Sequence, residues 1–275
     1  MEEVNQSVVS EFIILGLCSS WELQAFLLVI FSSLYLITIL GNIFIMLLII
    51  VDFHLHSPMY FLLANLSFID FCLSSVTTPK MITDFLKENK TISFEDCMCQ
   101  IFFGHFFGGG EMVLLVSMAY DRYVAICKPL HYSSIMNGQM CIGLVMTSWI
   151  VGFVHSISQL AMIIKLPFCG PRELDSFFCD IPLVIKLACT DTSILEMWIN
   201  ADSGVLATIS FIVLLISYSY ILFTICLHSK DGASKALSTC TAHITVVVLF
   251  LITPLLNPAI YTLRNKEIKN AIKRL

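Results

Sequence analysis

The chain alternates long apolar windows with short polar segments. Each of six windows is almost free of charged side chains and is long enough for the roughly 20 apolar residues that cross a bilayer as a helix. The hydrocarbon core offers no water to backbone N–H and C=O groups, so segments of this length must be helical. The pattern therefore predicts an all-α, polytopic transmembrane helical bundle. The predicted spans are residues 25–51, 57–79, 97–120, 140–164, 203–227 and 236–263.

Composition supports a membrane protein and excludes several functions. Charged residues make up only 13% of the chain and hydrophobic residues 57%, whereas soluble domains contain about 25% charged residues. An ordinary cytosolic enzyme is therefore excluded. The net charge of −5 also argues against nucleic-acid binding, because phosphate recognition needs a basic face.

Charge asymmetry predicts the orientation in the membrane. Residues 1–24 contain four glutamates and no lysine or arginine, whereas Lys128, Lys230 and Lys235 fall in alternate loops. The positive-inside rule then places residues 1–24 outside the cell, ahead of the bundle at 25–263 and a basic tail at 264–275. No basic segment precedes the first apolar run, which is too long for a cleavable signal peptide. We expect a multi-pass plasma-membrane protein whose first span is a signal anchor.

The same orientation places particular cysteines and asparagines outside. Cys97 begins the third span, and the predicted outer loop at 165–202 contains three further cysteines. Disulfides persist in an oxidising compartment, but spacing alone leaves the pairing open. Two acceptor sequences for N-glycosylation, at Asn5 and Asn89, also lie in predicted outer segments.

Two acidic residues lie in the middle of predicted spans. Asp70 is in the second span, and Glu111 precedes Asp121 by ten residues, which places it about 15 Å along the third helix. Intramembrane carboxylates are unfavourable unless they are paired or functional. We expect the two groups to lie at the same depth and to share a proton or bind one sodium ion. The alternative is two separately protonated structural acids.

The sequence has no pattern typical of a catalytic centre. No nucleophile has a paired base, and the glycines at 108–110 lie inside a membrane span, where they cannot form a nucleotide-binding loop. We therefore expect no enzyme activity and no cofactor other than the possible sodium ion.

Small residues in the third span allow either close helix packing or an open cavity.

Ordered motifs resemble one receptor family. Residues 118–127 read Met-Ala-Tyr-Asp-Arg-Tyr-Val-Ala-Ile-Cys, which is similar to the Asp-Arg-Tyr box of rhodopsin-like G-protein-coupled receptors in the extended form seen in olfactory receptors. The resemblance runs from about residue 10 to the C-terminal end of the sequence. Its other motifs are Gly41-Asn42, the segments 58–67, 217–221 and 235–243, and Asn257-Pro258-Ala259-Ile260-Tyr261.

This resemblance implies a sensory function. It implies a bundle of the rhodopsin-like type that binds a small volatile odorant, lies in membrane lipid and activates a heterotrimeric stimulatory G protein. A transporter or channel is the alternative class, but no internal repeat of the kind found in transporters is visible. The resemblance assigns G-protein coupling to Asp121, Arg122, Tyr123 and Tyr218. Charge alone would favour an interfacial anchor as the role of Arg122, and the flanking motif reverses this preference.

The resemblance also implies a ligand pocket and two disulfides. Asp70 resembles the sodium-site residue of rhodopsin-like receptors, and Ser176 stands where odorant receptors often have a histidine, which argues against a metal-assisted ligand site there. The implied disulfides are Cys97–Cys179 and Cys169–Cys189. The implied pocket residues are Gly104, His105, Gly108, Gly109, Met112, Asp202, Ser203 and Leu206.

The C-terminal region departs from the family pattern. Only 28 residues separate Lys235 from Arg264, whereas two crossings would need about 40 apolar residues and a loop. We therefore expect the sixth and seventh helices to be fused or truncated into one span, kinked at Pro254 and Pro258, for six spans in all. The basic tail favours instead a re-entrant segment with both ends inside. With the fused helix, we expect an incomplete pocket wall and weak or absent signalling.

Overall fold

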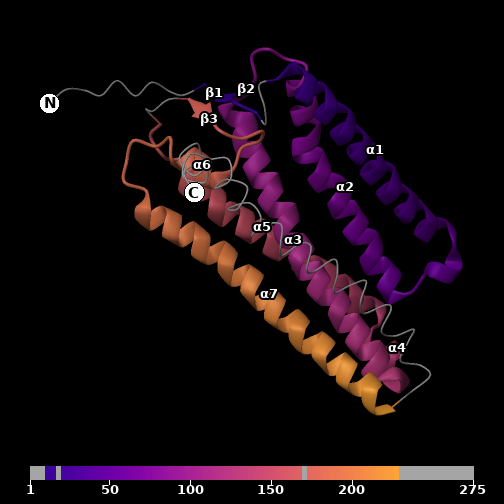
Figure 1. The fold of residues 1–275 in the computed structure, drawn as a ribbon. Helices are drawn as coiled ribbons and strands as arrows, with labels where there is room; N and C mark the ends of the chain where they lie inside the picture. Colours follow the sequence, from indigo (N-terminus) through magenta and orange to yellow (C-terminus); the bar gives the residue numbers. More distant parts are fainter. Residues whose placement is uncertain (1–9, 17–19, 169–171, 229–275) are drawn as a thin grey trace, which may run out of the picture.

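The computed structural model describes residues 10–16, 20–168 and 172–228. Within them, five helices are long and apolar enough to cross a membrane. They form a bundle of the rhodopsin-like receptor type (Figure 1). The predicted span at 236–263 lies outside the described residues. The two hypotheses about it, one fused and kinked span or a re-entrant segment, therefore concern residues that the structure does not describe. The five helices are α1 (Trp21–Val51), α2 (Pro58–Asp84), α3 (Phe94–Cys127), α5 (Gly138–Ile163) and α7 (Ser193–His228).

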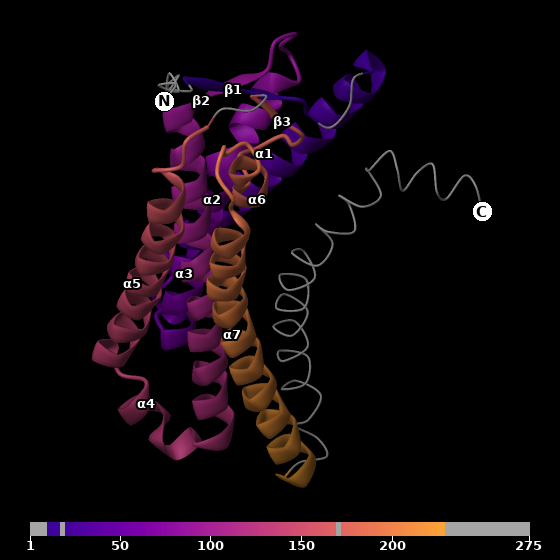
Figure 2. The same ribbon diagram turned by 90° about the vertical axis from the view of Figure 1, so that its left-hand side faces the viewer.

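Helix α3 is the centre of the described bundle. It packs against α2, α5 and α7, whereas α1 packs mainly against α2 (Figures 1 and 2). The burial pattern follows this arrangement. Buried residues occur along nearly the whole length of α3, but Ile49 is the only buried residue of α1. The large apolar side chains that α1 leaves exposed suit contact with lipid, because a membrane helix does not need to hide them.

The helices begin where capping residues allow. Ser20, Ser93 and Asn137 each accept a hydrogen bond from a backbone N–H in the first turn of the helix that follows. Helix α7 begins at Ser193, where Asp191 accepts from the Ser193 N–H, so the outer loop ends about ten residues earlier than the predicted 165–202. The apolar window missed this first part of the helix because its exposed outer turns contain polar residues.

A small sheet, which the apolar windows did not predict, covers the end of the bundle that the positive-inside rule predicts to lie outside the cell. This end is called the outer end below, and the opposite end the inner end. Strand β1 (Glu11–Ile14) pairs antiparallel with β2 (Thr91–Ser93) and parallel with β3 (Glu173–Leu174). It alternates exposed and buried residues, so Phe12 and Ile14 enter the core. The sheet and the short helix α6 (Ile181–Ile185) lie at one end of the bundle (Figure 2).

Short helices connect the long ones at the opposite end. Helix η1 (Phe53–Leu55) joins α1 to α2. Helices η2 (Pro129–His131) and α4 (Tyr132–Ile135) join α3 to α5 (Figure 2). The second connection returns the chain beneath the inner end of α3, so its side chains can contact the Asp-Arg-Tyr motif.

The contact between α3 and α5 leaves no room for a side chain at Gly152. A Cβ atom placed there would lie 2.4 Å from the Phe106 carbonyl oxygen and 2.8 Å from the Gly110 nitrogen. One turn further along α5, the Ser156 hydroxyl donates to the Phe102 carbonyl oxygen at 2.5 Å. Small residues spaced four apart therefore bring the two backbones together, as is common in membrane helix pairs.

We predict that Gly152→Ala destabilises the protein by about 1–3 kcal/mol, because the added methyl group overpacks a backbone–backbone contact. Gly143→Ala is the matched control on the same helix, since a Cβ atom there meets nothing within 4 Å. The measurement is thermal unfolding of both variants in one detergent, together with surface expression. Equal melting temperatures for the two variants would contradict the prediction.

Candidate functional site

A disulfide fixes the outer loop to the start of α3. Cys97 and Cys179 are bonded, with their Cα atoms 5.4 Å apart, and both side chains are buried. The Cys179 backbone N–H also donates to Oε1 of Gln100 at 3.1 Å. The structure thus contains the first of the two implied disulfides. The bond holds residues 178–180 over the outer end of the bundle.

The second implied disulfide is described at one end only. Cys189 is disulfide-bonded, and Cys169 lies outside the described residues. The neighbouring segments run side by side, because Phe168 forms an isolated β-bridge with Ala188. The Cys189 N–H also donates to the Pro167 carbonyl oxygen at 2.8 Å.

A cavity of about 670 Å³ lies beneath the disulfide-linked loop. This volume is within the range of small-molecule sites. Its wall combines α1, α2 and α3 with the loop residues next to Cys179, and its polar groups include three carboxyl groups. The lining residues are Thr38, Asn42, Asp70, Leu73, Ser74, Thr77, Gln100, Ile101, Gly104, His105, Glu111, Phe178, Cys179 and Asp180.

Some of the residues assigned to the pocket by resemblance lie elsewhere. Gly104 and His105 line the cavity. Gly109 instead packs against α5, since a Cβ atom on it would lie 3.3 Å from the Gly152 Cα atom. Asp202 and Ser203 bond to α5 side chains, and Gly108, Met112 and Leu206 are partly buried outside the cavity lining. Helix packing is therefore the role of Gly109 in this structure.

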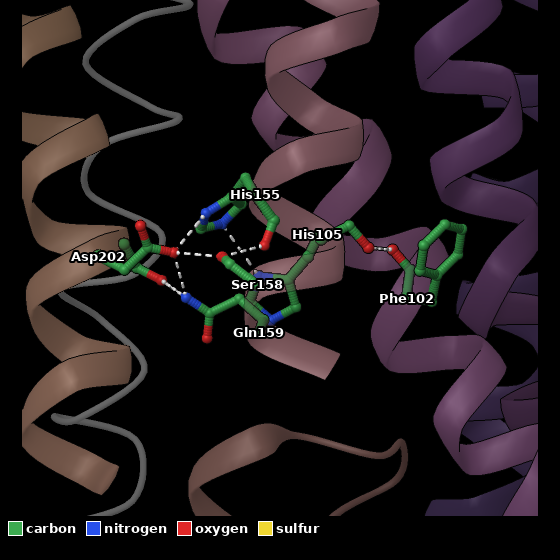
Figure 3. Close-up of polar contacts among 8 residues, drawn as sticks. Phe102, His105, His155, Ser158, Gln159 and Asp202 are labelled. Atoms are coloured by element: carbon green, nitrogen blue, oxygen red, sulfur yellow. Dashed lines mark hydrogen bonds and ion pairs between the residues drawn. The ribbon is translucent and has the colours of Figure 1, made fainter. Parts of the chain in front are cut away.

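Asp202 is the acceptor of a polar cluster between α5 and α7 (Figure 3). Its Oδ2 atom accepts from Nδ1 of His155 at 3.0 Å, from the Ser158 hydroxyl at 3.0 Å and from the Gln159 amide at 2.7 Å. His105 of α3 contacts the same cluster, with Nδ1 3.3 Å from Nε2 of His155. The α5 residues were not predicted. Their spacing of three and four is nevertheless the signal of one polar face on an apolar helix.

The two mid-span acids lie where the sequence placed them, on neighbouring helices. Asp70 of α2 and Glu111 of α3 both line the cavity, and Glu111 is buried. Asn42 and Ser74 add further oxygen atoms to the same wall. Within the described residues, no cluster of three or more histidine, cysteine and acidic side chains is arranged to hold a metal ion. Any ion there would therefore depend on two carboxylates and neutral oxygens.

The inner end of α3 contains a buried carboxylate with two partners. Oδ2 of Asp121 accepts from Nη2 and Nε of Arg122 at 2.5 and 3.0 Å, and Asp121 is fully buried. Oδ1 of Asp121 accepts from the Tyr132 hydroxyl at 2.7 Å. Burial, followed by this hydrogen bond, raises the pKa of Tyr132, so the phenol stays protonated as a donor. Tyr132 was not predicted, because it lies in a connection whose path depends on the tertiary fold.

The other two residues assigned to coupling lie between α3 and α7. The ring of Tyr123 packs edge-to-face on Tyr220, with centroids 5.4 Å apart. Tyr218 is buried against Leu115 and Ala119. The four predicted coupling residues therefore gather around the inner half of α3.

Comparison with known proteins identifies the family. A family model described as olfactory receptor matches residues 31–253. The chain is 56% identical to human olfactory receptor 4K3 over 297 aligned residues, which cover 98% of this chain and 94% of that protein. It is 55% identical to human olfactory receptor 4F4 over 294 residues, which cover 98% and 96%. The chain belongs to the olfactory receptor family.

Membership decides several expectations. Olfactory receptors are G-protein-coupled receptors and not enzymes. The chain is therefore a multi-pass membrane receptor of a family that senses odorants, as the motifs indicated. The competing expectation of a transporter or channel is not supported.

The olfactory receptor also lacks residues that its relatives have. Its alignment with human olfactory receptor 4K15 is 56% identical and covers 100% of this chain and 93% of that protein. That alignment runs over 301 positions although the receptor has 275 residues, so about 26 aligned positions have no residue here.

We predict that Cys97→Ser strongly reduces the level of folded receptor at the cell surface, because loss of a native disulfide destabilises a fold by about 2–5 kcal/mol. Cys99→Ser is the matched control, since Cys99 is free and exposed on the same helix. The double variant Cys97→Ser/Cys179→Ser should fall no further than either single variant. Surface staining of an N-terminal epitope measures all four. Additive losses would refute the bond.

Proposed function

We propose that the receptor binds small volatile odorants in the cavity beneath the disulfide-linked loop and activates a stimulatory heterotrimeric G protein. The observation that supports this proposal is the placement of two sites on one helix. Helix α3 contributes Gly104, His105 and Glu111 to the cavity and the buried Asp121–Arg122 pair to the opposite end. A ligand that binds one helix arrangement better than another shifts the population toward it. When α3 moves with the ligand, the Asp121–Arg122 pair at the inner end of the helix moves as well.

The receptor acts at the plasma membrane with its N-terminus outside. Strand β1 pairs with β2 and β3 at the end of the bundle that contains the Cys97–Cys179 disulfide. Disulfides persist on the outer face, so the N-terminal strand belongs on that face as well. The positive-inside rule gives the same orientation, and it leaves Asn5 and Asn89 accessible for glycosylation.

The Arg122 side chain is the group that meets the G protein. In this structure Asp121 holds it, and its side chain is 21% exposed. Breaking the pair would leave a buried carboxylate that Tyr132 alone satisfies, so release of Arg122 needs a rearrangement that also moves α4. This coupling makes the inner end a switch with two arrangements.

A second candidate function is a receptor-like chain that signals poorly. It is favoured by the 26 or so aligned positions without a residue and by the short interval between Lys235 and Arg264. If the missing positions fall in that interval, the sixth and seventh helices are incomplete. Ligand binding at the α3 cavity would then persist without full G-protein activation.

We expect Arg122→Ala to reduce odorant-stimulated nucleotide exchange at least tenfold, because the G protein loses its central cationic contact. Arg172→Ala is the control, since it removes one arginine from the exposed outer loop. Exchange is measured with purified receptor and stimulatory G protein over a broad odorant panel. If nucleotide exchange persisted in Arg122→Ala, the assignment of Arg122 to G-protein contact would be overturned. If the unmodified receptor bound odorant but stimulated no exchange, the second candidate function would be favoured.

We also propose that Asp70 and Glu111 bind one sodium ion in the cavity, with Asn42 and Ser74 as neutral oxygen donors. Hard cations take oxygen ligands. At a sodium concentration ten times the dissociation constant, the ion would stabilise the receptor by about 1.4 kcal/mol. We expect sodium chloride to raise the melting temperature relative to choline chloride, and Asp70→Asn to abolish this shift. The exposed Glu88→Gln should keep it. An unchanged shift in Asp70→Asn would exclude the site.

A further inference from the structure

One hydrogen-bonded chain of side chains connects three helices (Figure 3). It runs from Asp202 of α7 through His155 of α5 to His105 of α3, with distances of 3.0 Å and 3.3 Å. The last member also lines the cavity. This series of hydrogen bonds therefore starts at a carboxylate outside the cavity and ends at an imidazole on the cavity wall.

Asp202 determines which nitrogen of His155 is protonated. Oδ2 of Asp202 lies within hydrogen-bond distance of Nδ1 of His155, the Gln159 amide and the Ser158 hydroxyl, whose single hydrogen also reaches the His155 carbonyl oxygen at 2.7 Å. Donation from the Gln159 amide to Oδ2 fits an ionised carboxylate. A carboxylate can only accept, so Nδ1 of His155 has the hydrogen. A neutral imidazole has one N–H, which leaves Nε2 of His155 as an acceptor.

The same argument applies to the next ring. Nε2 of His155 accepts from Nδ1 of His105, so the single hydrogen of a neutral His105 is on Nδ1. Both rings are uncharged in this scheme, because a protonated His155 would also donate from Nε2 and would reverse the direction of its bond to His105. Nε2 of His105 is then a free lone pair. Among the described residues, no side chain or backbone group donates to that nitrogen.

We propose that the Asp202–His155–His105 chain makes Nε2 of His105 a hydrogen-bond acceptor in the cavity and thereby selects ligands with an O–H or N–H donor. Alcohols and phenols would bind in preference to ketones and ethers of the same shape. The neighbouring Gly104 leaves space beside the ring, because a Cβ atom there would meet nothing within 4 Å. This inference rests on the proposed function of the cavity as the odorant site.

Asp202 and His155 are positioning residues in this scheme, because they act on the ligand only through His105. A purely structural role for them would change the stability of the bundle and the affinity for every ligand alike. The proposed role changes the ratio of affinities between matched ligands. It also changes the position of a proton, which can be observed without any ligand.

The first measurement is the protonation state of His105. Full-length receptor labelled with ¹⁵N-histidine is reconstituted in lipid nanodiscs, and the His105→Gln variant assigns the signals. We expect a protonated Nδ1 and an unprotonated Nε2 for His105. In His155→Phe, which keeps a ring but removes both nitrogens, that proton distribution should change. A protonated Nε2 in the unmodified receptor would overturn the proposal.

The second measurement is binding of matched pairs to the same preparation, such as menthol with menthone and 4-ethylphenol with 4-ethylanisole. We expect the hydroxyl compounds that bind to do so about fivefold to tenfold more tightly than their partners, which corresponds to one net hydrogen bond. The ratio should fall toward one in His155→Phe and in Asp202→Asn, the second variant in case the first misfolds. Asp191→Asn, an acid-to-amide change just before the same helix, should keep it.

The outcomes separate this inference from the proposed function. Equal affinities within each pair, or tighter binding of the ketone and ether, would overturn the inference and leave odorant binding intact. Absence of binding by every compound, in a receptor that unfolds cooperatively, would overturn both. If the affinity ratio within each pair stayed the same in both His155→Phe and Asp202→Asn, the inference would also be overturned. His105 would then select its ligands without Asp202.

Discussion

The backbone contact between α3 and α5 at Gly152 determines where the polar groups of the receptor lie. Because a Cβ atom cannot fit there, the two helices approach closely enough for Ser156 to bond to the Phe102 carbonyl oxygen. His155, next to Ser156 in sequence, then reaches both His105 and Asp202. A bulkier residue at Gly152 would separate these groups. A packing constraint in the middle of α5 thus sets the geometry of hydrogen bonds one turn further along the helix.

Hydrogen-bonding groups inside the bundle fall into two kinds. Those between α3, α5 and α7 bond to one another, as lipid-embedded polar groups must. Asp70 and Glu111 lie instead on the wall of a cavity, where a ligand, an ion or water can bind them. His105 belongs to both kinds, because one of its nitrogens bonds to α5 and the ring lines the cavity. In the proposed scheme, it is therefore the residue through which a ligand in the cavity would affect the bonding between helices.

For the first four helices, the apolar windows predicted the starts within four residues and the ends within seven, since lipid excludes charge over a fixed thickness. The predicted start was wrong where a helix extends into water, as α7 does at Ser193. The apolar windows also did not predict the sheet. Strand β1 exists because residues 91–93 and 173–174, far away in sequence, supply its partners. Similarly, the small residues of the third span allowed either close packing or a cavity, and the sequence did not show that Gly152 lies opposite Gly109. Tertiary contacts, which one sequence does not reveal, decide such positions.

Since Asp202, His155 and His105 belong to three different helices, the hydrogen bonds between them exist only in some arrangements of the bundle. A ligand that needs the lone pair of His105 binds these arrangements better than others. By thermodynamic linkage, the bound ligand then shifts the equilibrium toward these arrangements by the same factor by which they raise its affinity. Helix α3 continues without a break from His105 to Asp121. In the proposed scheme, one equilibrium between helix arrangements therefore governs both ligand selection and the position of the Asp121–Arg122 pair.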